Sequence, residues 1–185
     1  SSDLMAQVSL IDPASSAAAV KPTLDKINGA FGVVPNMFKA VANSPAALAS
    51  MWGSFGALGG GKLGARLGEE IAVAVANANS CEYCLAAHTA LGRKAGASSD
   101  EMAAAQAGES SDPRTQSALT FALKVVRDRG GVTDADVAAL KTAGFDDEGV
   151  VEVIAHVALN LFTNYVNVAL NVPVDFPAVQ LKHVA

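Results

Sequence analysis

Apolar residues in this chain fall into short segments with helical spacing, separated by residues that begin or end helices. Runs of alternating β-branched residues, which are typical of strands, are almost absent. We therefore predict an all-α protein, a multi-helix bundle of eight or nine helices. These cover about residues 22–27, 37–42, 45–58, 65–76, 81–95, 98–107, 113–128, 133–143 and 146–170.

Capping residues set most of these boundaries. Ser44–Pro45 and Asp112–Pro113 each place an N-cap residue before a proline at the first helical position. Ser98 and Glu101 have the spacing of a capping box. Asn28–Gly29 and Gly96 are predicted helix ends, because Asn and Gly accept the left-handed backbone conformation that follows many helices.

The longest apolar segment, residues 150–170, is not predicted to cross a membrane. A membrane span tolerates few ionisable or amide side chains, and a buried core helix accepts them when they have partners. The polar residues that interrupt the segment are Glu152, His156, Asn160, Asn164 and Asn167.

Composition narrows the class of protein. With 185 residues, 51% hydrophobic and 17% charged, the chain has too much apolar surface for a disordered protein. We predict a single domain over residues 1–185, with its core at about 22–177. A net charge of −5 argues against nucleic-acid binding. Residues 1–4 carry no basic segment leading into an apolar run, so we expect a cytoplasmic protein without a secretory signal.

One segment carries candidate chemistry: Cys81-Glu82-Tyr83-Cys84-Leu85-Ala86-Ala87-His88. On a helix, Cys81, Cys84 and His88 lie within about 60° of one another. Asn and Ser residues before Cys81 place it at a helix N-terminus, where the macrodipole and free N–H groups favour a thiolate. Two thiols and an imidazole on one face are suited to reducing a peroxide or exchanging a disulfide.

The motif leaves two other interpretations open. Structural zinc needs four ligands as a rule, and only three are local, so Glu69, His156 or His183 would have to supply the fourth. The two cysteines are also compatible with inert packing in a core, where a thiol behaves as a small apolar group. Redox chemistry is the favoured interpretation of the three.

The residues before and after the motif resemble a known family. Glu69 lies twelve residues before Cys81, and this spacing, followed by C-x-x-C-x-x-x-H, resembles the AhpD-like branch of the carboxymuconolactone decarboxylase superfamily. Farther along, residues 158–165 and 174–177 resemble the tail of its peroxidase-related members. The likeness extends over about residues 22–177 and implies an all-helical fold that assembles into dimers, trimers or hexamers.

The resemblance also implies roles for four residues. Cys84 would attack the peroxide, Cys81 would resolve the sulfenic acid by forming a disulfide, and Glu69 and His88 would relay protons. The best-studied members carry histidine directly before the second cysteine, where this chain has Tyr83. A phenol with a pKa of about 10 does not replace that imidazole near neutral pH, so lower peroxidase efficiency is expected. The helix dipole favours a thiolate at Cys81 and His88 favours one at Cys84, so the sequence leaves the order of attack open.

Other residues have structural interpretations. His156 is predicted to be a core histidine hydrogen-bonded to Glu152, with a place in a pocket wall facing the helix of the two cysteines as the alternative. A polar stripe recurs at helical spacing and is predicted to lie at a subunit interface rather than in a pocket. It comprises Asn160, Asn164, Asn167 and Asn171. The large apolar residues Met51, Trp52, Phe55, Phe31, Phe38 and Phe162 are predicted to be core or interface residues, with a pocket wall as the alternative for the last three.

The sequence thus predicts a thiol-dependent enzyme that reduces hydroperoxides through a Cys81–Cys84 cycle. The expected partners are a small hydroperoxide, a dithiol electron donor and further copies of the chain. No metal, haem or flavin is expected as a cofactor. A decarboxylase of the muconolactone type and a non-enzymatic zinc or redox-sensing protein are the alternatives. A mean hydropathy of +0.31 is high for a soluble monomer and favours an oligomer that covers apolar surface.

Overall fold

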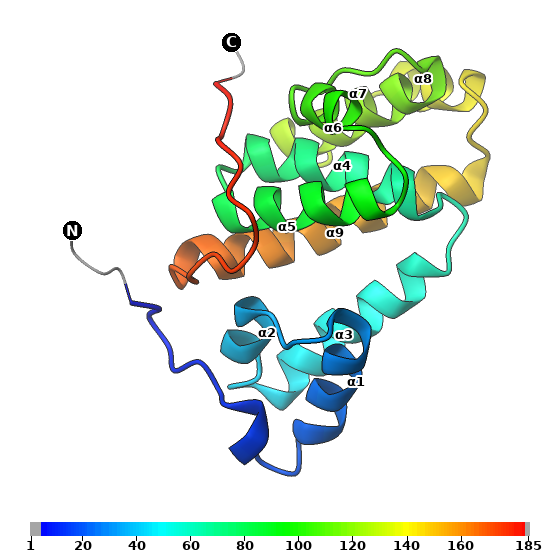
Figure 1. Ribbon diagram of the computed structural model, residues 1–185. Coiled ribbons are helices and arrows are strands. Elements are labelled where there is room, and N and C mark those ends of the chain that lie inside the picture. The colour runs from blue at the N-terminus through cyan, green and yellow to red at the C-terminus, as the bar shows by residue number, and fades with distance from the viewer. Residues whose placement is uncertain (1–4, 184–185) are drawn as a thin grey trace.

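The computed structural model describes residues 5–183, and this part of the chain is helical without strands. Figure 1 shows two groups of helices, α1–α3 at the bottom and α4–α9 above them. The all-α prediction is confirmed. The elements are η1 (Pro13–Ser15), α1 (Lys21–Phe31), α2 (Asn36–Val41), α3 (Pro45–Gly59), α4 (Ala65–Ala78), α5 (Glu82–Lys94), α6 (Ser99–Gln106), α7 (Pro113–Arg127), α8 (Asp134–Thr142) and α9 (Asp147–Ala169).

The predicted caps begin the helices as expected. The Ser44 hydroxyl accepts a hydrogen bond from the amide of Ala47 at 3.1 Å, and α3 starts at the next residue. Ser98 and Glu101 form a reciprocal capping box at the start of α6. Such bonds satisfy amide groups that have no partner inside the helix.

The predicted end of α1 is wrong. Asn28 and Gly29 lie inside the helix, which continues to Phe31 and ends at Gly32. Gly32 has φ 77°, and its amide donates to the Asn28 carbonyl oxygen. The extra turn lets the Phe31 ring pack at 6.1 Å from the Phe38 ring, a contact that local sequence does not reveal.

Helix α4 forms the centre of the upper group, because it contacts α5, α6, α7 and α9. Ten of its residues are buried, from Leu67 to Asn77. Helix α9 also packs against α3, α5, α7 and α8. Within the described residues, α9 is the one helix long and apolar enough to cross a membrane, with a mean hydropathy of 1.3 over a window that is 44% buried inside the molecule.

Candidate functional site

The turn between α4 and α5 positions the cysteine pair. Ser80 adopts a left-handed conformation, φ 56°, which reverses the chain directly before Cys81. Cys81 is the N-cap of α5, and its Sγ accepts a hydrogen bond from the Cys84 amide at 3.2 Å. The predicted place of Cys81 at a helix N-terminus is confirmed, and the N–H donation stabilises negative charge on this sulfur.

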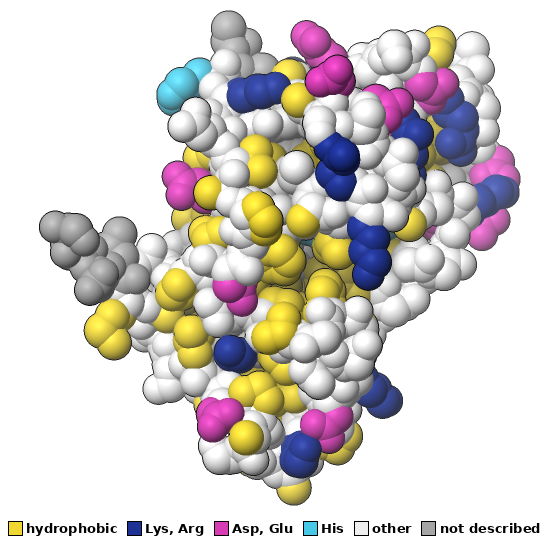
Figure 2. All heavy atoms as spheres, viewed as in Figure 1, with side chains coloured by type: hydrophobic (Ala, Val, Ile, Leu, Met, Phe, Trp, Pro, Cys, Tyr) yellow, Lys and Arg dark blue, Asp and Glu magenta, His cyan; other side chains and the backbone are white. Residues whose placement is uncertain are grey.

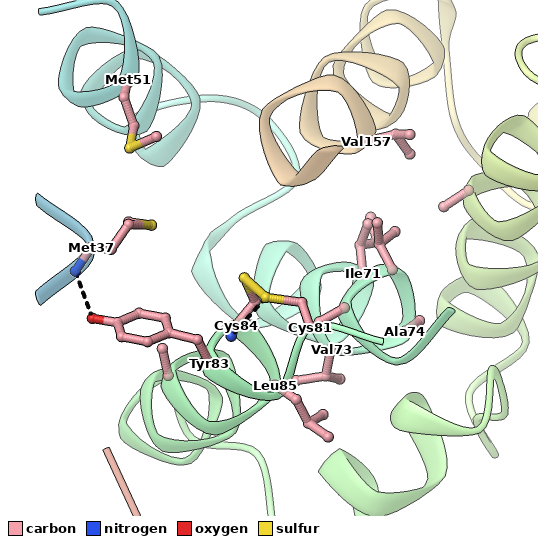
Figure 3. Packing of buried hydrophobic residues seen from close by; sticks show 14 of the residues in the cluster. Met37, Met51, Ile71, Val73, Ala74, Cys81, Tyr83, Cys84, Leu85 and Val157 are labelled. Atoms are coloured by element: carbon pink, nitrogen blue, oxygen red, sulfur yellow. Dashed lines mark hydrogen bonds between the residues drawn. A yellow bond between two sulfur atoms is a disulfide. The ribbon is translucent and has the colours of Figure 1, made fainter. Parts of the chain in front are cut away.

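Cys81 and Cys84 form a disulfide in this structure, as the close view in Figure 3 shows. Their Cα atoms are 5.3 Å apart, within the usual range for a disulfide. The two residues are 1% and 2% exposed. The sulfur pair is therefore held inside the protein and is reachable only through cavities.

Glu69 and His88 form the second part of the site. Glu69 on α4 places Oε2 2.6 Å from Nδ1 of His88 on α5, and both side chains are largely buried. Gly92, one turn after His88, brings α5 close to its neighbours, because a Cβ there would collide with Met102 and lie 3.3 Å from the Cβ of Glu69. The carboxylate orients the imidazole, which is the arrangement needed for a proton relay.

A cavity of about 300 Å³ joins these groups. Cys84, Glu69 and His88 line it together, whereas Cys81 does not. Figure 2 shows hydrophobic side chains gathered in the middle of the face where the two groups of helices meet. The apolar and aromatic residues that line the cavity include Phe31, Met37, Phe38, Trp52, Phe55, Tyr83, Leu91 and Phe176.

The aromatic rings form a connected wall. Phe38 packs edge to face against Trp52 at 5.7 Å and against Phe55 at 6.0 Å. Phe31 and Phe38 therefore take the pocket-wall role that was the alternative prediction. Phe162 instead lines a separate surface hollow between α3 and α9, and Met51 is fully buried.

Asn167 on α9 completes the surroundings of Cys84. Its Nδ2 donates to the Cys84 Sγ at 3.2 Å and to the Thr163 carbonyl oxygen at 2.9 Å. Asn164 accepts from Asn79 at 2.9 Å, and Asn160 donates to the backbone oxygen of His156. The predicted interface role of this stripe is wrong for Asn160, Asn164 and Asn167, which are buried within the chain. A buried side-chain amide needs a hydrogen-bond partner. Asparagines on an otherwise apolar helix were therefore a signal, present in the sequence, of polar contacts inside the protein.

Tyr83 acts as a structural residue between the helix groups. Its hydroxyl oxygen accepts a hydrogen bond from the Met37 amide at 3.1 Å, near the start of α2 (Figure 3). The Asp175 carboxylate accepts from the Asn36 amide at 2.8 Å, so two distant side chains cap α2. Burial, together with the Asp175 charge, raises the pKa of Tyr83 well above its ordinary value. The phenol therefore stays protonated near neutral pH.

His156 does not bond to Glu152, so that prediction is wrong. Glu152 accepts hydrogen bonds from the amides of Lys62 and Leu63. His156 lies against Gly68, where a Cβ would be 3.1 Å from its Cε1, and it lines a small cavity of about 120 Å³ together with Glu69 and His88. This is the alternative prediction, a place in the wall near the site. Burial lowers the pKa of His156, against the opposing charges of Glu152 and Glu69.

The remaining candidate ligands do not gather around the cysteines. His183 lies exposed on the C-terminal segment. Glu70, which follows Glu69 on α4, pairs with Arg66 at 3.4 Å. Within residues 5–183 no three side chains of His, Cys, Asp or Glu lie close enough together to hold a metal ion. The site of these residues is thus a disulfide, a Glu–His pair and an amide around an apolar cavity.

The fold and the site together define a class of protein. Its members are all-helical and carry a cysteine pair at the start of a buried helix, beside a glutamate–histidine pair. The carboxymuconolactone decarboxylase family model matches residues 45–111, which include Glu69, both cysteines and His88. Over these residues the chain is similar to the carboxymuconolactone decarboxylase family, and its fold is that of peroxidase-related proteins with an AhpD core. No curated protein matches the sequence.

Solved structures share the fold over most of the chain. A peroxidase-related protein from Silicibacter sp. TM1040 has 25% identity and a TM-score of 0.81, with 92% of each chain covered. A peroxidase-related protein with an alkylhydroperoxidase AhpD core, from Ralstonia eutropha JMP134, has 26% identity and the same TM-score, with 92% of this chain and 93% of that chain covered. The debrominase Bmp8, solved as a variant with 2,3,4-tribromopyrrole, has 20% identity and a TM-score of 0.77, with 92% and 94% covered, and shows the same fold.

Proposed function

We propose that this protein is a thiol-dependent hydroperoxide reductase. Its family and its peroxidase-related neighbours support a role as an antioxidant enzyme or another enzyme of the superfamily. The observation that carries the finer proposal is the shared cavity of Cys84, Glu69 and His88. A sulfur, a proton relay and an apolar wall are what reduction of an organic hydroperoxide requires.

The reaction begins with the reduced cysteine pair. The Glu69–His88 pair takes the proton of Cys84, and the thiolate attacks the terminal peroxide oxygen, so that the O–O bond breaks and a sulfenic acid forms. The leaving alkoxide receives the proton from the same pair and departs as an alcohol. The Cys81 thiol then attacks the sulfenic sulfur, water leaves, and the disulfide seen here results.

Cys84 is the attacking residue in this proposal, because it lines the cavity with the proton relay and Cys81 does not. The Asn167 amide, which donates to the Cys84 sulfur, stabilises the same thiolate.

The decisive experiment measures consumption of an alkyl hydroperoxide by the protein with dithiothreitol as the reductant. Cys84→Ser should reduce the rate to that of the buffer. His88→Asn should lower it about 100-fold or more, because positioned acid–base groups contribute about 10²–10⁴-fold. Cys81→Ser, the matched control, should still form a sulfenic acid with one equivalent of peroxide. A Cys84→Ser variant as active as the wild type would refute the mechanism.

A second candidate reaction is removal of bromine from a bromopyrrole, because the neighbour Bmp8 is named a debrominase and was solved in complex with 2,3,4-tribromopyrrole. The observation that favours it here is the wall of aromatic rings in the cavity that Cys84 lines. In such a reaction the aryl bromide and two thiols yield the debrominated ring, bromide, a proton and the disulfide. Release of bromide from tribromopyrrole, compared with consumption of hydroperoxide, distinguishes the two candidates.

We also propose a homo-oligomer in a reducing, cytoplasmic compartment, where a dithiol donor regenerates the cysteine pair. Exposed apolar side chains on α9 support the assembly: Val151 is 64% exposed, Tyr165 60% and Ile154 42%. Exposed large apolar side chains on one helix are typical of a subunit contact.

A further inference from the structure

The two cysteines line different cavities. Cys84 lines the apolar cavity with Glu69 and His88. Cys81 lines a second groove of about 330 Å³, together with Ser80, Glu82, Asn171 and Val174. Neither sulfur-bearing residue lines the cavity of the other.

Two residues separate these spaces. Tyr83 and Asn167 line both the cavity and the groove, so they lie between them. The groove differs in character from the aromatic cavity, because its lining combines Ser80, Glu82 and Asn171 with short aliphatic side chains. The disulfide therefore runs from an apolar compartment to a polar one.

Thiol–disulfide exchange is directional. The attacking thiolate approaches one sulfur along the S–S axis, from the side away from the sulfur that leaves. A donor in the groove is placed to attack the sulfur of Cys81, whereas a donor in the cavity would attack Cys84. The assignment of each cysteine to its own cavity thus fixes which sulfur a reductant meets.

We propose that the groove beside Cys81 is the binding site of the dithiol reductant, so that oxidant and reductant use opposite sides of the disulfide. The donor thiolate attacks the Cys81 Sγ, the S–S bond breaks, and a mixed disulfide between donor and Cys81 forms. The second donor thiol then displaces Cys81. The donor leaves as its own disulfide, and both protein thiols are restored with the two protons of the donor.

The leaving sulfur is prepared for this step. Cys84 departs as a thiolate, and its Sγ already accepts the Asn167 Nδ2 hydrogen bond at 3.2 Å. A better-stabilised leaving thiolate accelerates exchange. Cys84 is then released in the cavity that holds the Glu69–His88 pair, ready for the next hydroperoxide.

The charge of the groove selects among donors. Of its lining residues only Glu82 carries a formal charge, and its side chain is exposed. A carboxylate at this position repels an anionic donor and leaves a neutral one unaffected. The site therefore favours an uncharged dithiol over one that carries carboxylates.

This inference rests on the proposed function for the role of the cysteine pair, and separate half-reactions test the two. Reduction of the disulfide by dithiothreitol and oxidation of the dithiol by hydroperoxide are each followed by thiol alkylation and mass spectrometry. Val168→Trp places a large side chain on an exposed residue that lines the groove. Val33→Trp is the matched control, because it is an exposed valine outside both the groove and the cavity.

Val168→Trp should slow reduction about tenfold, since exchange depends on access to the attacked sulfur, and should leave oxidation unchanged. Val33→Trp should change neither rate. Gly56→Phe, which fills the cavity from a position with no atom near its Cβ, should slow oxidation and leave reduction unchanged. If Val168→Trp slows both half-reactions, Val174→Trp, on another segment of the groove, decides between a filled groove and an altered fold.

A further experiment tests the charge of the groove by comparing the rate of disulfide reduction by dithiothreitol with the rate by the anionic dithiol dimercaptosuccinate. Glu82→Gln should reduce the preference for dithiothreitol about threefold at low salt, because charge steering mainly changes association rates. Normal reduction of Val168→Trp, or reduction slowed by Gly56→Phe, would overturn the proposed groove. Failure of hydroperoxide to oxidise the wild-type dithiol would refute the proposed function alone, because diamide can form the disulfide for the reduction assay.

Discussion

Cys84 is surrounded by groups that come from three helices: the Cys81 sulfur and His88 on α5, Glu69 on α4 and Asn167 on α9. The local motif supplies only the first two. The Asn167 amide, 83 residues away in sequence, donates to the Cys84 sulfur at 3.2 Å. This contact changes the stability of the Cys84 thiolate, which the motif alone does not determine.

Asn167→Leu should raise the pKa of the Cys84 thiol in the reduced protein by about one unit, because a hydrogen bond to a charged group contributes about 1.5–3 kcal/mol. The pH profile of alkylation by iodoacetamide measures the shift. Asn160→Leu is the matched control, since Asn160 is equally buried on α9 and donates to a backbone oxygen instead. Identical profiles for the two variants would contradict a role of Asn167 at the sulfur.

Tyr83→Phe should destabilise the protein by about 1–3 kcal/mol, because the buried Met37 amide loses its acceptor. Urea unfolding measures this difference. The rate of hydroperoxide reduction should change little, since the raised pKa keeps the phenol protonated near neutral pH. A large loss of activity with unchanged stability would instead assign the tyrosine a chemical role.

At the scale of helices, local capping chemistry predicted most boundaries. Each N-cap residue bonds only to an amide a few residues along the chain, so its effect can be predicted from local sequence. The helices begin as expected at Ser44, Ser98 and Asp112. The end of α1 was not predictable, because it depends on the Phe31–Phe38 contact across a loop. Whether a helix stops at the first or second available glycine is decided by packing.

The same distinction explains the site. Glu69, Cys81, Cys84 and His88 lie within 20 residues, where sequence spacing is informative. Asn167 and His156 come from α9, and their partners depend on how α9 is rotated against α4 and α5. Helical periodicity shows that residues share a face, and it does not show what that face contacts.

His156 at the α4–α9 contact gives this helix pair a dependence on pH. Burial lowers the pKa of its imidazole, with Glu152 and Glu69 opposing and His88 adding to the shift. Below about pH 6.5 the unfolded chain binds a proton that the native histidine resists, so stability falls as the pH falls. At higher pH both states are neutral and the residue makes no such contribution.

His156→Gln should therefore lose less stability than the wild type between pH 7 and pH 5. Urea denaturation at both pH values gives the two differences in free energy of unfolding. The other histidines are present in both proteins and cancel in the comparison. Equal losses would show that the native imidazole protonates as readily as in the unfolded chain.

At the scale of the whole molecule, α9 carries most of the exposed large hydrophobic residues within residues 5–183. Four of the exposed large hydrophobic residues lie on this helix: Val168 lines the groove beside Cys81, whereas Val151, Ile154 and Tyr165 lie outside it. The internal face of the same helix holds the asparagines that were predicted for the interface. Helix α9 thus serves the site with one face and presents exposed apolar side chains elsewhere.

Ile154→Asp should shift the protein towards a monomer, because a charge in an apolar contact costs its desolvation free energy. Sedimentation velocity at micromolar concentration measures the assembly. Val33→Asp is the control, since Val33 is 57% exposed but lies in the loop between α1 and α2. A monomeric wild-type protein would contradict the proposed oligomer.

The hydrogen bond between Tyr83 and Met37 links the two groups of helices that enclose the cavity. An amide that is bonded in this way exchanges with deuterium only when its partner moves away. Exchange at the single amide of Met37 therefore measures how often the group of α1–α3 separates from α5. One nuclear magnetic resonance signal, next to the cysteine pair, reports the opening frequency of the cavity.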